Sequence, residues 1–386
     1  MFSNRIVPCF IPRLIACCVL AVPLAASGAP LYNVHLLGPA GSMAYDINLR
    51  GQVVGRYING NGDTRAFIHS GNGLLDLGTF GGSRAVARAI NDSGVVVGEA
   101  YNAAGHDRAF SYAAGVLSDL GSFGGPVATA AGINRAGIIV GHATRPDQSG
   151  AAFRLTAGGM QALGALPGDG EYGQGLAVNA WGQVAGVSGF GRYGPPNYPT
   201  HAFLYSNGVM HDLGTLGGWY SSGDAINDAG VVVGQASTRI NPDRDPDPMG
   251  HTVPHAFIYL DGLMIDLGTL DEAASVSAAH DINNLGQVVG YSSTRNGNRA
   301  FLYQAGSMVD LNRLIDPGSG WTIEYAMAIS DLQQIAGTGC RDGQCYAVRL
   351  DLVSEAPEPG AGMLMALALA LLGWSTRRAR PVHTPQ

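Results

Sequence analysis

Hydrophobic and polar positions recur along the chain in a fixed order. The anchor of the pattern is a segment of the form Ile-Asn-x-x-Gly-x-Val-Val-Gly, in which the end of one apolar strand, a polar turn and a second strand follow one another. The anchor recurs at intervals of 43 to 56 residues, and its seventh copy is degraded: Ile47-Asn48, Ile90-Asn91, Ile133-Asn134, Val178-Asn179, Ile226-Asn227, Ile282-Asn283 and Ile329-Ser330. We number the repeats one to seven by these anchors.

Two further strand signals follow each anchor. A third strand contains an Ala-Phe pair, at Ala66-Phe67, Ala109-Phe110, Ala152-Phe153, Ala202-Phe203, Ala256-Phe257, Ala300-Phe301 and, more weakly, Ala347-Val348. A fourth strand ends in Leu-Gly or Leu-Asn, at Leu77-Gly78, Leu120-Gly121, Leu163-Gly164, Leu213-Gly214, Leu267-Gly268 and Leu311-Asn312. This strand is missing after the last repeat, but Leu31 to Gly38 has the same pattern and precedes the first anchor.

Four short strands in a repeat of about 43 residues are typical of a propeller blade. The pattern therefore predicts an all-β, seven-bladed β-propeller of four-stranded blades over residues 30–353, in which the N-terminal strand completes the last blade. A β-solenoid is the alternative, which the displaced first strand disfavours. In the anchors, Asn bonds its own backbone and Gly takes a positive φ, so we interpret the Asn residues as turn formers and not as ligands.

Composition narrows the function classes. The chain has 57 Gly among 386 residues and only 13% charged residues, which disfavours a helical protein. All 22 basic residues are Arg, so mechanisms that need a Schiff-base or P-loop lysine are excluded. The net charge of -7 argues against nucleic acid as a partner.

The two ends have the composition of targeting segments. Residues 1–29 combine basic residues, an apolar run and small residues, which predicts a cleaved signal peptide; lipidation at Cys17 is the alternative. A linker (354–359) with Pro357, Glu358 and Pro359 precedes an apolar segment (360–374), predicted to be a transmembrane helix. An Arg-rich, cytoplasmic tail (375–386) follows, with the basic cluster Arg377, Arg378 and Arg380.

This C-terminal region resembles the PEP-CTERM sorting signal of Gram-negative bacteria. The resemblance implies recognition by an exosortase, cleavage near the tripeptide, and a protein that is transiently anchored in the inner membrane before it reaches the cell surface or the extracellular space. A simple C-terminal membrane anchor is the alternative.

The body of the chain resembles the HAF-repeat family of extracellular proteins, named for the motif seen here as His201-Ala202-Phe203 and His255-Ala256-Phe257. Arg replaces the His at Arg65, Arg108 and Arg299, and Ala151 replaces it in the third repeat. Because Arg substitutes for His, we interpret this position as a polar residue at a strand edge. The resemblance implies location and architecture but no activity.

Two cysteines remain once the signal peptide is removed. Cys340 and Cys345 flank a predicted tight turn, and export places them in an oxidising compartment, so we expect a local disulfide. A metal site would need two more ligands, which the sequence does not place.

Two long insertions and one connector are the candidate binding region. They bring Arg192, Tyr193, Tyr198, Trp219 and Tyr220 to one face of the predicted ring, where aromatic rings could stack on sugars. Asp243, Asp245 and Asp247 alternate as in a calcium loop, but Pro248 and Pro254 stand at positions that require Gly and Glu.

We therefore expect an exported binding or structural module, with a surface glycan or exopolysaccharide as ligand and no cofactor. The alternative is a polysaccharide-active hydrolase or lyase, which paired carboxylates about 5 to 10 Å apart on the loop face would support. The string from Gly189 to Gly194 matches a dinucleotide-binding pattern, but two prolines follow it instead of a helix.

Overall fold

The computed structural model describes residues 31–167, 172–189, 200–238, 253–271 and 276–353. Within these ranges the chain is almost entirely β, and the only helices are two 3-10 turns, η1 (Leu311–Arg313) and η2 (Pro317–Ser319). Neither is long and apolar enough to cross a membrane. The predicted signal peptide, the PEP tripeptide, the helix 360–374 and the Arg cluster lie outside the described residues.

Each repeat folds into consecutive antiparallel strands, as its four strand signals predict. The first strands are β2 (Met43–Ile47), β6 (Gly81–Ile90), β10 (Ala128–Ile133), β14 (Gly173–Val178), β18 (Gly217–Ile226), β22 (Ser277–Ile282) and β26 (Thr322–Ile329). The second strands are β3 (Val53–Ile58), β7 (Val96–Asn102), β11 (Ile139–Thr144), β15 (Val184–Gly189), β19 (Val232–Thr238), β23 (Val288–Thr294) and β27 (Ile335–Arg341).

The third strands contain the Ala-Phe pairs and the fourth strands are the short outer ones. The third strands are β4 (Thr64–Ser70), β8 (Asp107–Ala113), β12 (Gly150–Thr156), β16 (Thr200–Ser206), β20 (Pro254–Leu260), β24 (Gly297–Gln304) and β28 (Gln344–Leu352). The fourth strands are β5 (Gly73–Asp76), β9 (Val116–Asp119), β13 (Gly159–Ala162), β17 (Val209–Asp212), β21 (Leu263–Asp266), β25 (Ser307–Asp310) and, from the start of the chain, β1 (Tyr32–Leu36).

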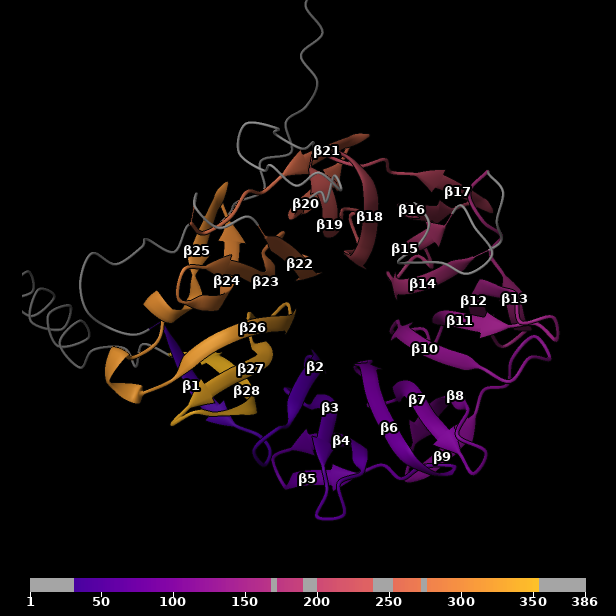
Figure 1. Ribbon diagram of the computed structural model, residues 1–386, viewed down its shortest axis with the longest axis horizontal. Helices are drawn as coiled ribbons and strands as arrows, with labels where there is room; N and C mark the ends of the chain where they lie inside the picture. The colour runs from indigo at the N-terminus through magenta and orange to yellow at the C-terminus, as the bar shows by residue number, and fades with distance from the viewer. Residues whose placement is uncertain (1–30, 168–171, 190–199, 239–252, 272–275, 354–386) are drawn as a thin grey trace, which may run out of the picture.

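The sheets are arranged radially, as in a β-propeller (Figure 1). The first strands surround the axis and the fourth strands lie on the rim. Single parallel pairs, Thr64 with Arg84 and Thr200 with Tyr220, join two neighbouring pairs of sheets into eight-stranded sheets. The turns between first and second strands and between third and fourth strands share one side of the ring, the turn face, and the other connections share the loop face.

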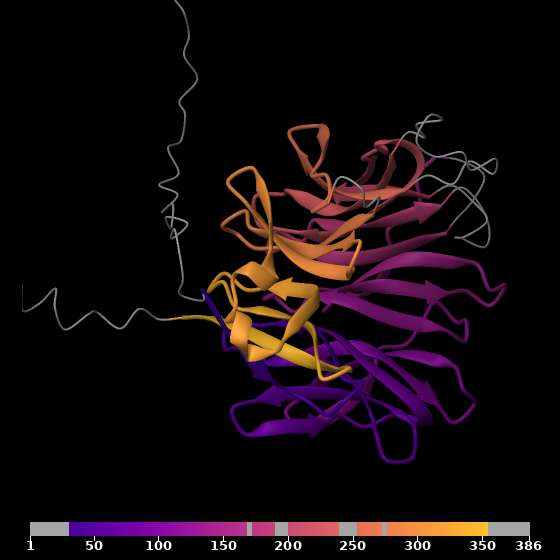
Figure 2. The ribbon, with the colours of Figure 1, turned by 60° about the vertical axis from the view of Figure 1, so that its left-hand side comes forward.

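The two ends of the described body lie side by side. β1 pairs antiparallel with β28, from Tyr32 opposite Leu352 to Leu36 opposite Val348 (Figure 2). The amide of Val353 donates to the carbonyl of Leu31 at 2.8 Å. The first described segment is therefore the outer strand of the sheet formed by the last repeat.

The hydrophobic core lies between neighbouring sheets. The Phe of each Ala-Phe pair is fully buried, and Phe110 of repeat two packs in one cluster with Val54 of repeat one. Phe67 of repeat one packs in the same way with Ala336 and Ala347 of repeat seven. Burial of one such aromatic ring between two sheets contributes roughly 2–3 kcal/mol, so each repeat depends on its neighbours for stability.

The anchor Asn residues link successive repeats. In repeat one, the Oδ1 atom of Asn48 accepts hydrogen bonds from the backbone N–H groups of Arg50 and Gln52, each at 3.0 Å. Its Nδ2 atom donates to the backbone carbonyl of Asn91 in repeat two at 3.0 Å. The same donation runs from Asn91 to Asn134, Asn134 to Asn179, Asn179 to Asn227, Asn227 to Asn283 and Asn283 to Ser330. We call this series the asparagine chain.

The side chain of Ser330 has no amide group, so the asparagine chain does not continue from repeat seven to repeat one. There the Nη1 atom of Arg349 donates instead to the carbonyl of Gly51 at 2.8 Å. The Asn residues are thus turn formers, and they also bond one repeat to the next.

Every first strand contains a β-bulge at the same position. The pairing of β6 with β7 skips Arg88, between Ala87 and Ala89, and the other first strands skip the equivalent residue. The bulge brings the carbonyl of Val86 so close to Gly98 that a Cβ there would lie 2.0 Å from the carbonyl oxygen. The Gly of the Val-Val-Gly signal is therefore required by the bulge and not only by a turn.

Candidate functional site

The residues skipped by the bulges form a ring around the axis. This axial ring consists of Tyr45, Arg88, Ala131, Leu176, Asp224, His280 and Met327, one from each repeat. Each of these side chains is partly or fully accessible, whereas the preceding Ala in the repeat, such as Ala87 or Ala279, is 0% exposed. The axial ring is thus chemically varied, although the position before it holds Ala or Gly in every repeat.

Arginines and carboxylates of repeat two form a cluster beside Tyr45 of repeat one. The guanidinium group of Arg88 binds the buried carboxylate of Glu99 at 2.7 Å and lies 5.2 Å from the ring centroid of Tyr45. Arg84 bridges Glu99 at 3.1 Å and Asp107 at 2.6 Å. These charges compensate one another, which fixes the position of the arginines.

A carboxylic acid lies on the opposite side of the ring. Asp224 is on β18, which faces β6 across the axis (Figure 1). Although its side chain is partly accessible, protein surrounds it, and this burial raises the pKa of Asp224 from 3.8 to about 7. The hydroxyl of Ser222 donates to Asp224 Oδ1 at 2.5 Å, which opposes that shift. The group is therefore able to donate or accept a proton near neutral pH.

Four tyrosines from four consecutive repeats lie near one another, and two of them, Tyr220 and Tyr291, interact with the charge of Asp224. We call Tyr172, Tyr220, Tyr291 and Tyr325 the tyrosine arc; all four are partly accessible. Burial and then the charge of Asp224 raise the pKa of Tyr220, and Tyr172 and Tyr291 act on it more weakly. The rings of Tyr291 and Tyr325 have centroids 5.1 Å apart. The tyrosine arc lies toward the loop face, because Tyr220 and Tyr172 are at the start of first strands.

Two histidines flank the tyrosine arc. The ring of His142 lies 5.4 Å from that of Tyr172, and the ring of His280 lies 5.5 Å from that of Tyr291. His280 Nδ1 is 3.1 Å from the carbonyl oxygen of Ala326, so this nitrogen carries the proton in the neutral ring. Burial lowers the pKa of both histidines, which favours their neutral form.

The structure places part of the predicted binding region on this face. Trp219 is 44% exposed on β18, next to Tyr220 of the tyrosine arc. Arg192, Tyr193 and Tyr198 lie outside the described residues, and so do the calcium candidates Asp243, Asp245 and Asp247.

The sequence pattern predicted Tyr220 of the tyrosine arc, but none of the axial ring and none of the other three tyrosines. One signal in the sequence could have identified the axial ring. Its position lies two residues before the anchor Ile, varies between repeats, and follows a small residue in every repeat.

In repeats one, two, four and five, the His or Arg of the HAF-type motif pairs with an Asp eleven residues later. Repeat six also has both residues, but Arg299 donates to the carbonyl of Asn298 and Asp310 accepts from the amide of Asn312. His201 Nδ1 binds Asp212 at 2.9 Å, and His255 binds Asp266 in the same way. Repeats one and two use Arg65 with Asp76 and Arg108 with Asp119.

Repeats three and seven change both members of the pair together. The two positions hold Ala151 with Ala162 and Tyr346 with Leu36. Because both residues change together, we interpret the pair as a contact that stabilises the sheet and not as a ligand-binding site.

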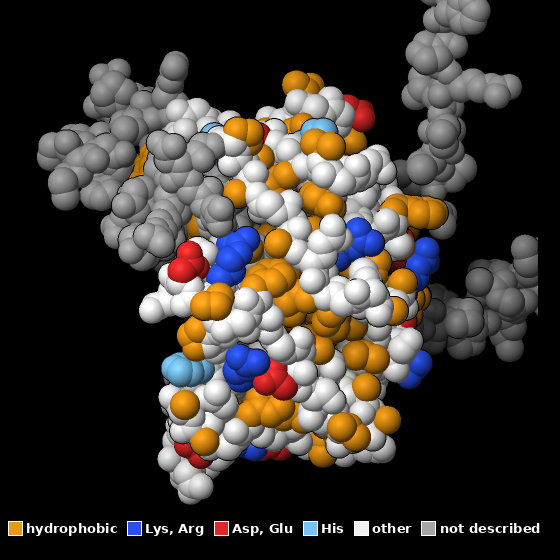
Figure 3. Space-filling model, turned by 90° about the vertical axis from the view of Figure 1, so that its right-hand side faces the viewer, with side chains coloured by type: hydrophobic (Ala, Val, Ile, Leu, Met, Phe, Trp, Pro, Cys, Tyr) orange, Lys and Arg blue, Asp and Glu red, His pale blue; other side chains and the backbone are white. Residues whose placement is uncertain are grey.

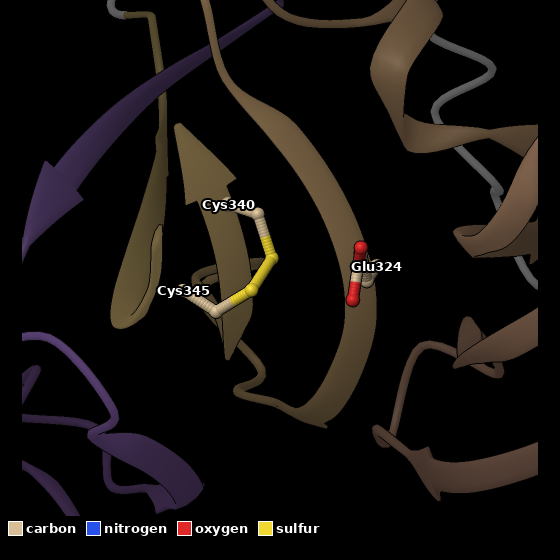
Figure 4. A group of neighbouring side chains, drawn as sticks. All are labelled: Glu324, Cys340 and Cys345. Atoms are coloured by element: carbon tan, nitrogen blue, oxygen red, sulfur yellow. A yellow bond between two sulfur atoms is a disulfide. The ribbon is translucent and has the colours of Figure 1, made fainter. Parts of the chain in front are cut away.

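Cys340 and Cys345 form a disulfide across the hairpin of β27 and β28. The carboxylate of Glu324 on β26 faces the bridge, with the three ligand atoms within 4.8 Å of one another (Figure 4). Because both sulfur atoms are bonded to each other, they are not available as thiolate ligands for a metal ion.

The rim presents a mixed surface. Figure 3 shows charged side chains of both signs, scattered among neutral and apolar ones, over the side of the ring near β9 and β13.

No protein-family model and no curated protein matches the chain. Among solved structures, TolB from Acinetobacter baumannii has a TM-score of 0.43 and 13% identity, over 69% of this chain and 61% of that chain. A puromycin-hydrolyzing peptidase from Mycobacterium tuberculosis has a TM-score of 0.47 and 14% identity, over 84% and 52%. The tricorn protease has a TM-score of 0.39 and 12% identity, over 83% and 32%. The chain spans less than two thirds of each, and these likenesses say nothing about its activity.

Proposed function

We propose that this protein is an exported, surface-associated β-propeller that binds a glycan at the axis, on the side of the loop face. The observation that carries the proposal is the tyrosine arc, which gathers four partly accessible phenol rings, two of which, Tyr220 and Tyr291, interact with Asp224. Tyrosine rings stack on the apolar faces of sugars, and the carboxyl oxygens of the partly accessible Asp224 are suited to bind hydroxyl groups. Partly buried rings held by backbone strands lose little entropy on binding.

An oligosaccharide array followed by isothermal titration with a retained oligosaccharide tests this function. We expect Tyr220→Ala in the full-length protein to weaken binding about tenfold, because it removes a stacking surface and a hydroxyl. Tyr112→Ala, a tyrosine on the outer part of β8, is the matched control and should bind like the wild type. If no oligosaccharide is retained, or if Tyr220→Ala binds unchanged, the proposal fails.

We infer further that the repeats are seven blades and that β1 closes the ring. The pairing of β1 with β28 and the packing of Phe67 with Ala336 and Ala347 support this inference. Deletion of residues 31–37 tests it, since an open β28 edge would cause association and a large loss of stability. A deletion variant that stays monomeric and melts like the wild type would contradict closure.

The location of the protein rests on its PEP-CTERM-like tail. An exosortase would recognise Pro357-Glu358-Pro359, with the apolar segment and Arg377, Arg378 and Arg380 holding the chain in the membrane. Mass spectrometry of the C-terminus of the secreted protein, from cells with and without exosortase, tests this. A mature protein that keeps residues 360–386 at the cell surface would favour a simple anchor.

A polysaccharide-active enzyme is the second candidate function. The observation in its favour is the pKa of about 7 for Asp224 beside the tyrosine arc, which suits general acid or base catalysis. The release of new reducing ends or unsaturated products from a bound polysaccharide, abolished in Asp224→Asn, would support an enzyme. A polysaccharide that is bound and stays intact would support the binding module.

A further inference from the structure

The turn face carries a depression that lies on the opposite side of the ring from the tyrosine arc. Its volume is about 440 Å³, and its lining includes Arg154 of repeat three with Trp181, Gln183, Ser206 and Asn207 of repeat four. It therefore lies where two neighbouring repeats meet.

Arg154 is an exception at its position in the repeat. The residue that follows the Phe of the Ala-Phe pair is Ile68, Ser111, Leu204, Ile258 and Leu302 in five other repeats. In repeat seven it is Arg349, and this provides a direct comparison, because Arg154 pairs with Val140 as Arg349 pairs with Ala336. Each arginine also reaches the turn glycine of the next repeat, Gly182 or Gly51.

Arg349 is neutralised within the protein. Its Nη2 atom binds the carboxylate of Asp351 at 2.7 Å, and its Nη1 atom donates to the carbonyl of Gly51 at 2.8 Å. Gln334 holds the other side of that carboxylate, because its Nε2 atom donates to Asp351 Oδ1 at 2.8 Å.

Arg154 lacks every one of these partners. Thr156 stands where repeat seven has Asp351, and Ile138 stands where it has Gln334. The Nε atom is buried without a hydrogen-bond partner in both Arg154 and Arg349, so the two arginines differ at their Nη atoms, which have partners only in Arg349. Within the described ranges, no ion pair or hydrogen bond satisfies the guanidinium group of Arg154, although a buried donor without a partner is unfavourable.

An exposed indole ring lies beside Arg154. Trp181 is 73% exposed, at a turn position that is Ala136 in repeat three and Ala229 in repeat five. Its Nε1 atom donates to the carbonyl of Asp228 at 2.9 Å, which restricts the orientation of the ring. A large apolar surface is thus held open next to an unpaired cation.

We propose that this depression binds a hexuronate residue of an acidic polysaccharide. The carboxylate of the sugar would pair with Arg154 and so take the place that Asp351 fills at Arg349. A guanidinium group binds a carboxylate through two parallel hydrogen bonds, and a flat indole suits a pyranose face. Gln183, Ser206 and Asn207 supply polar groups for the hydroxyls. A shallow, polar-lined site with one aromatic surface favours a sugar over an acidic peptide, whose side chains would require apolar pockets.

Isothermal titration of the full-length protein with trigalacturonate and with its methyl ester tests the site. The two probes share the sugar rings, but only the acid carries carboxylates. We expect the acid to bind on the order of ten- to a hundredfold more tightly than the ester, as one charge-assisted contact predicts.

Four variants separate the roles of the residues. Arg154→Leu, which restores the residue of repeat four, should abolish the preference for the acid. Thr156→Asp should supply the missing carboxylate from within the protein, raise the melting temperature and prevent binding of the acid. Thr156→Asn is the uncharged control and should bind like the wild type. Trp181→Ala should weaken binding of both probes.

The proposal is overturned if the wild type binds neither probe, if it binds both equally, or if Arg154→Leu keeps the preference. Binding of polyglutamate but not of trigalacturonate would show that the occupant is an acidic peptide. The site does not depend on the tyrosine arc, because Tyr220→Ala should leave the binding of trigalacturonate unchanged, so the two functions can fail separately.

Discussion

Asp76 accepts two hydrogen bonds from the guanidinium group of Arg65, at 2.9 and 3.1 Å, although the residues lie on different strands. The hydroxyl of Tyr57 and the amide of Gly78 donate to the same carboxylate. Burial alone would raise the pKa of Asp76, but these donors outweigh it and hold the pKa below its ordinary value.

We expect Asp76→Asn to lower the free energy of unfolding by about 1–2 kcal/mol at pH 7, since it weakens several charge-assisted bonds of a partly buried group. Asp119→Asn is the matched control, because Asp119 has an Arg and a Gly partner but no tyrosine. The pKa of Asp76 is lowered, so its contribution is present above about pH 4 and disappears as the pH falls below that value. Urea denaturation at pH 7 and pH 3 measures both effects; an equal loss for both variants at both pH values would contradict the prediction.

The asparagine chain predicts that one amide nitrogen stabilises the contact between two repeats. Asn134 accepts from Ala136 and Ile138 through Oδ1 and donates to Asn179 at 2.8 Å. Asn134→Ala should lower the free energy of unfolding by about 2–4 kcal/mol, because it removes three buried hydrogen bonds. Asn134→Asp keeps the two acceptor bonds and places an oxygen against the carbonyl of Asn179, so it isolates the contact between repeats. An Asn134→Asp variant as stable as the wild type in chemical denaturation would show that this contact contributes nothing.

The carboxyl group of Asp46 predicts a loss of stability toward alkaline pH. It accepts from the amides of Ile47 and Ile90, each at 2.7 Å, and so joins repeats one and two. Burial and then the charge of Asp281 raise its pKa to about 8, against these two hydrogen bonds. The folded state therefore favours the protonated group, whose contribution is complete below about pH 4 and is lost as the pH rises through 8.

Between pH 5 and pH 9, the free energy of unfolding should fall less in Asp46→Asn than in the wild type, by on the order of 1–3 kcal/mol. Denaturation at several pH values measures this difference. Asp281→Asn is a useful comparison, because the pKa of Asp281 is raised only to about 6 and its effect should end at a lower pH. A wild-type stability that does not decline between pH 5 and pH 9 would refute the assignment.

The disulfide should contribute little to the free energy of unfolding, although it is a covalent bond. Cys340 and Cys345 are already opposite each other in the hairpin of β27 and β28, and the bond closes a short loop. The entropy of so short a loop limits the stabilisation to about 2 kcal/mol. The double variant Cys340→Ser and Cys345→Ser should fold and melt a few degrees lower, and dithiothreitol should lower the melting temperature of the wild type only. Failure of the double variant to fold would contradict this estimate.

The strand pattern was predictable because each signal has a local cause. Asn48 and Gly51 shape a turn within five residues, and the strand order of every repeat follows from such turns. The all-β class is confirmed, and the pattern of Leu31 to Gly38 correctly predicted a displaced outer strand beside the last repeat.

The candidate sites depend on relations between repeats, which the local pattern does not contain. Asp224 was unremarkable in the sequence, and its accessibility at the axis follows from a bulge and from strands that close around it. Arg154 looks like any strand arginine until Arg349 shows which partners it lacks. Sequence reasoning also directed attention to the loop face, because the insertions lie there, whereas the depression beside Trp181 lies among short turns.

The neighbouring positions of Leu31 and Val353 have a mechanical consequence. Tyr32 and Leu352 are paired at the same end of two antiparallel strands, so a force that pulls the two ends of the body apart acts on that pair first. The hydrogen bonds between β1 and β28 then carry the load one after another and open in sequence, while the other repeats lie outside the path of the force. Under tension between its ends, the protein should therefore release one outer strand at low force and keep its remaining sheets folded.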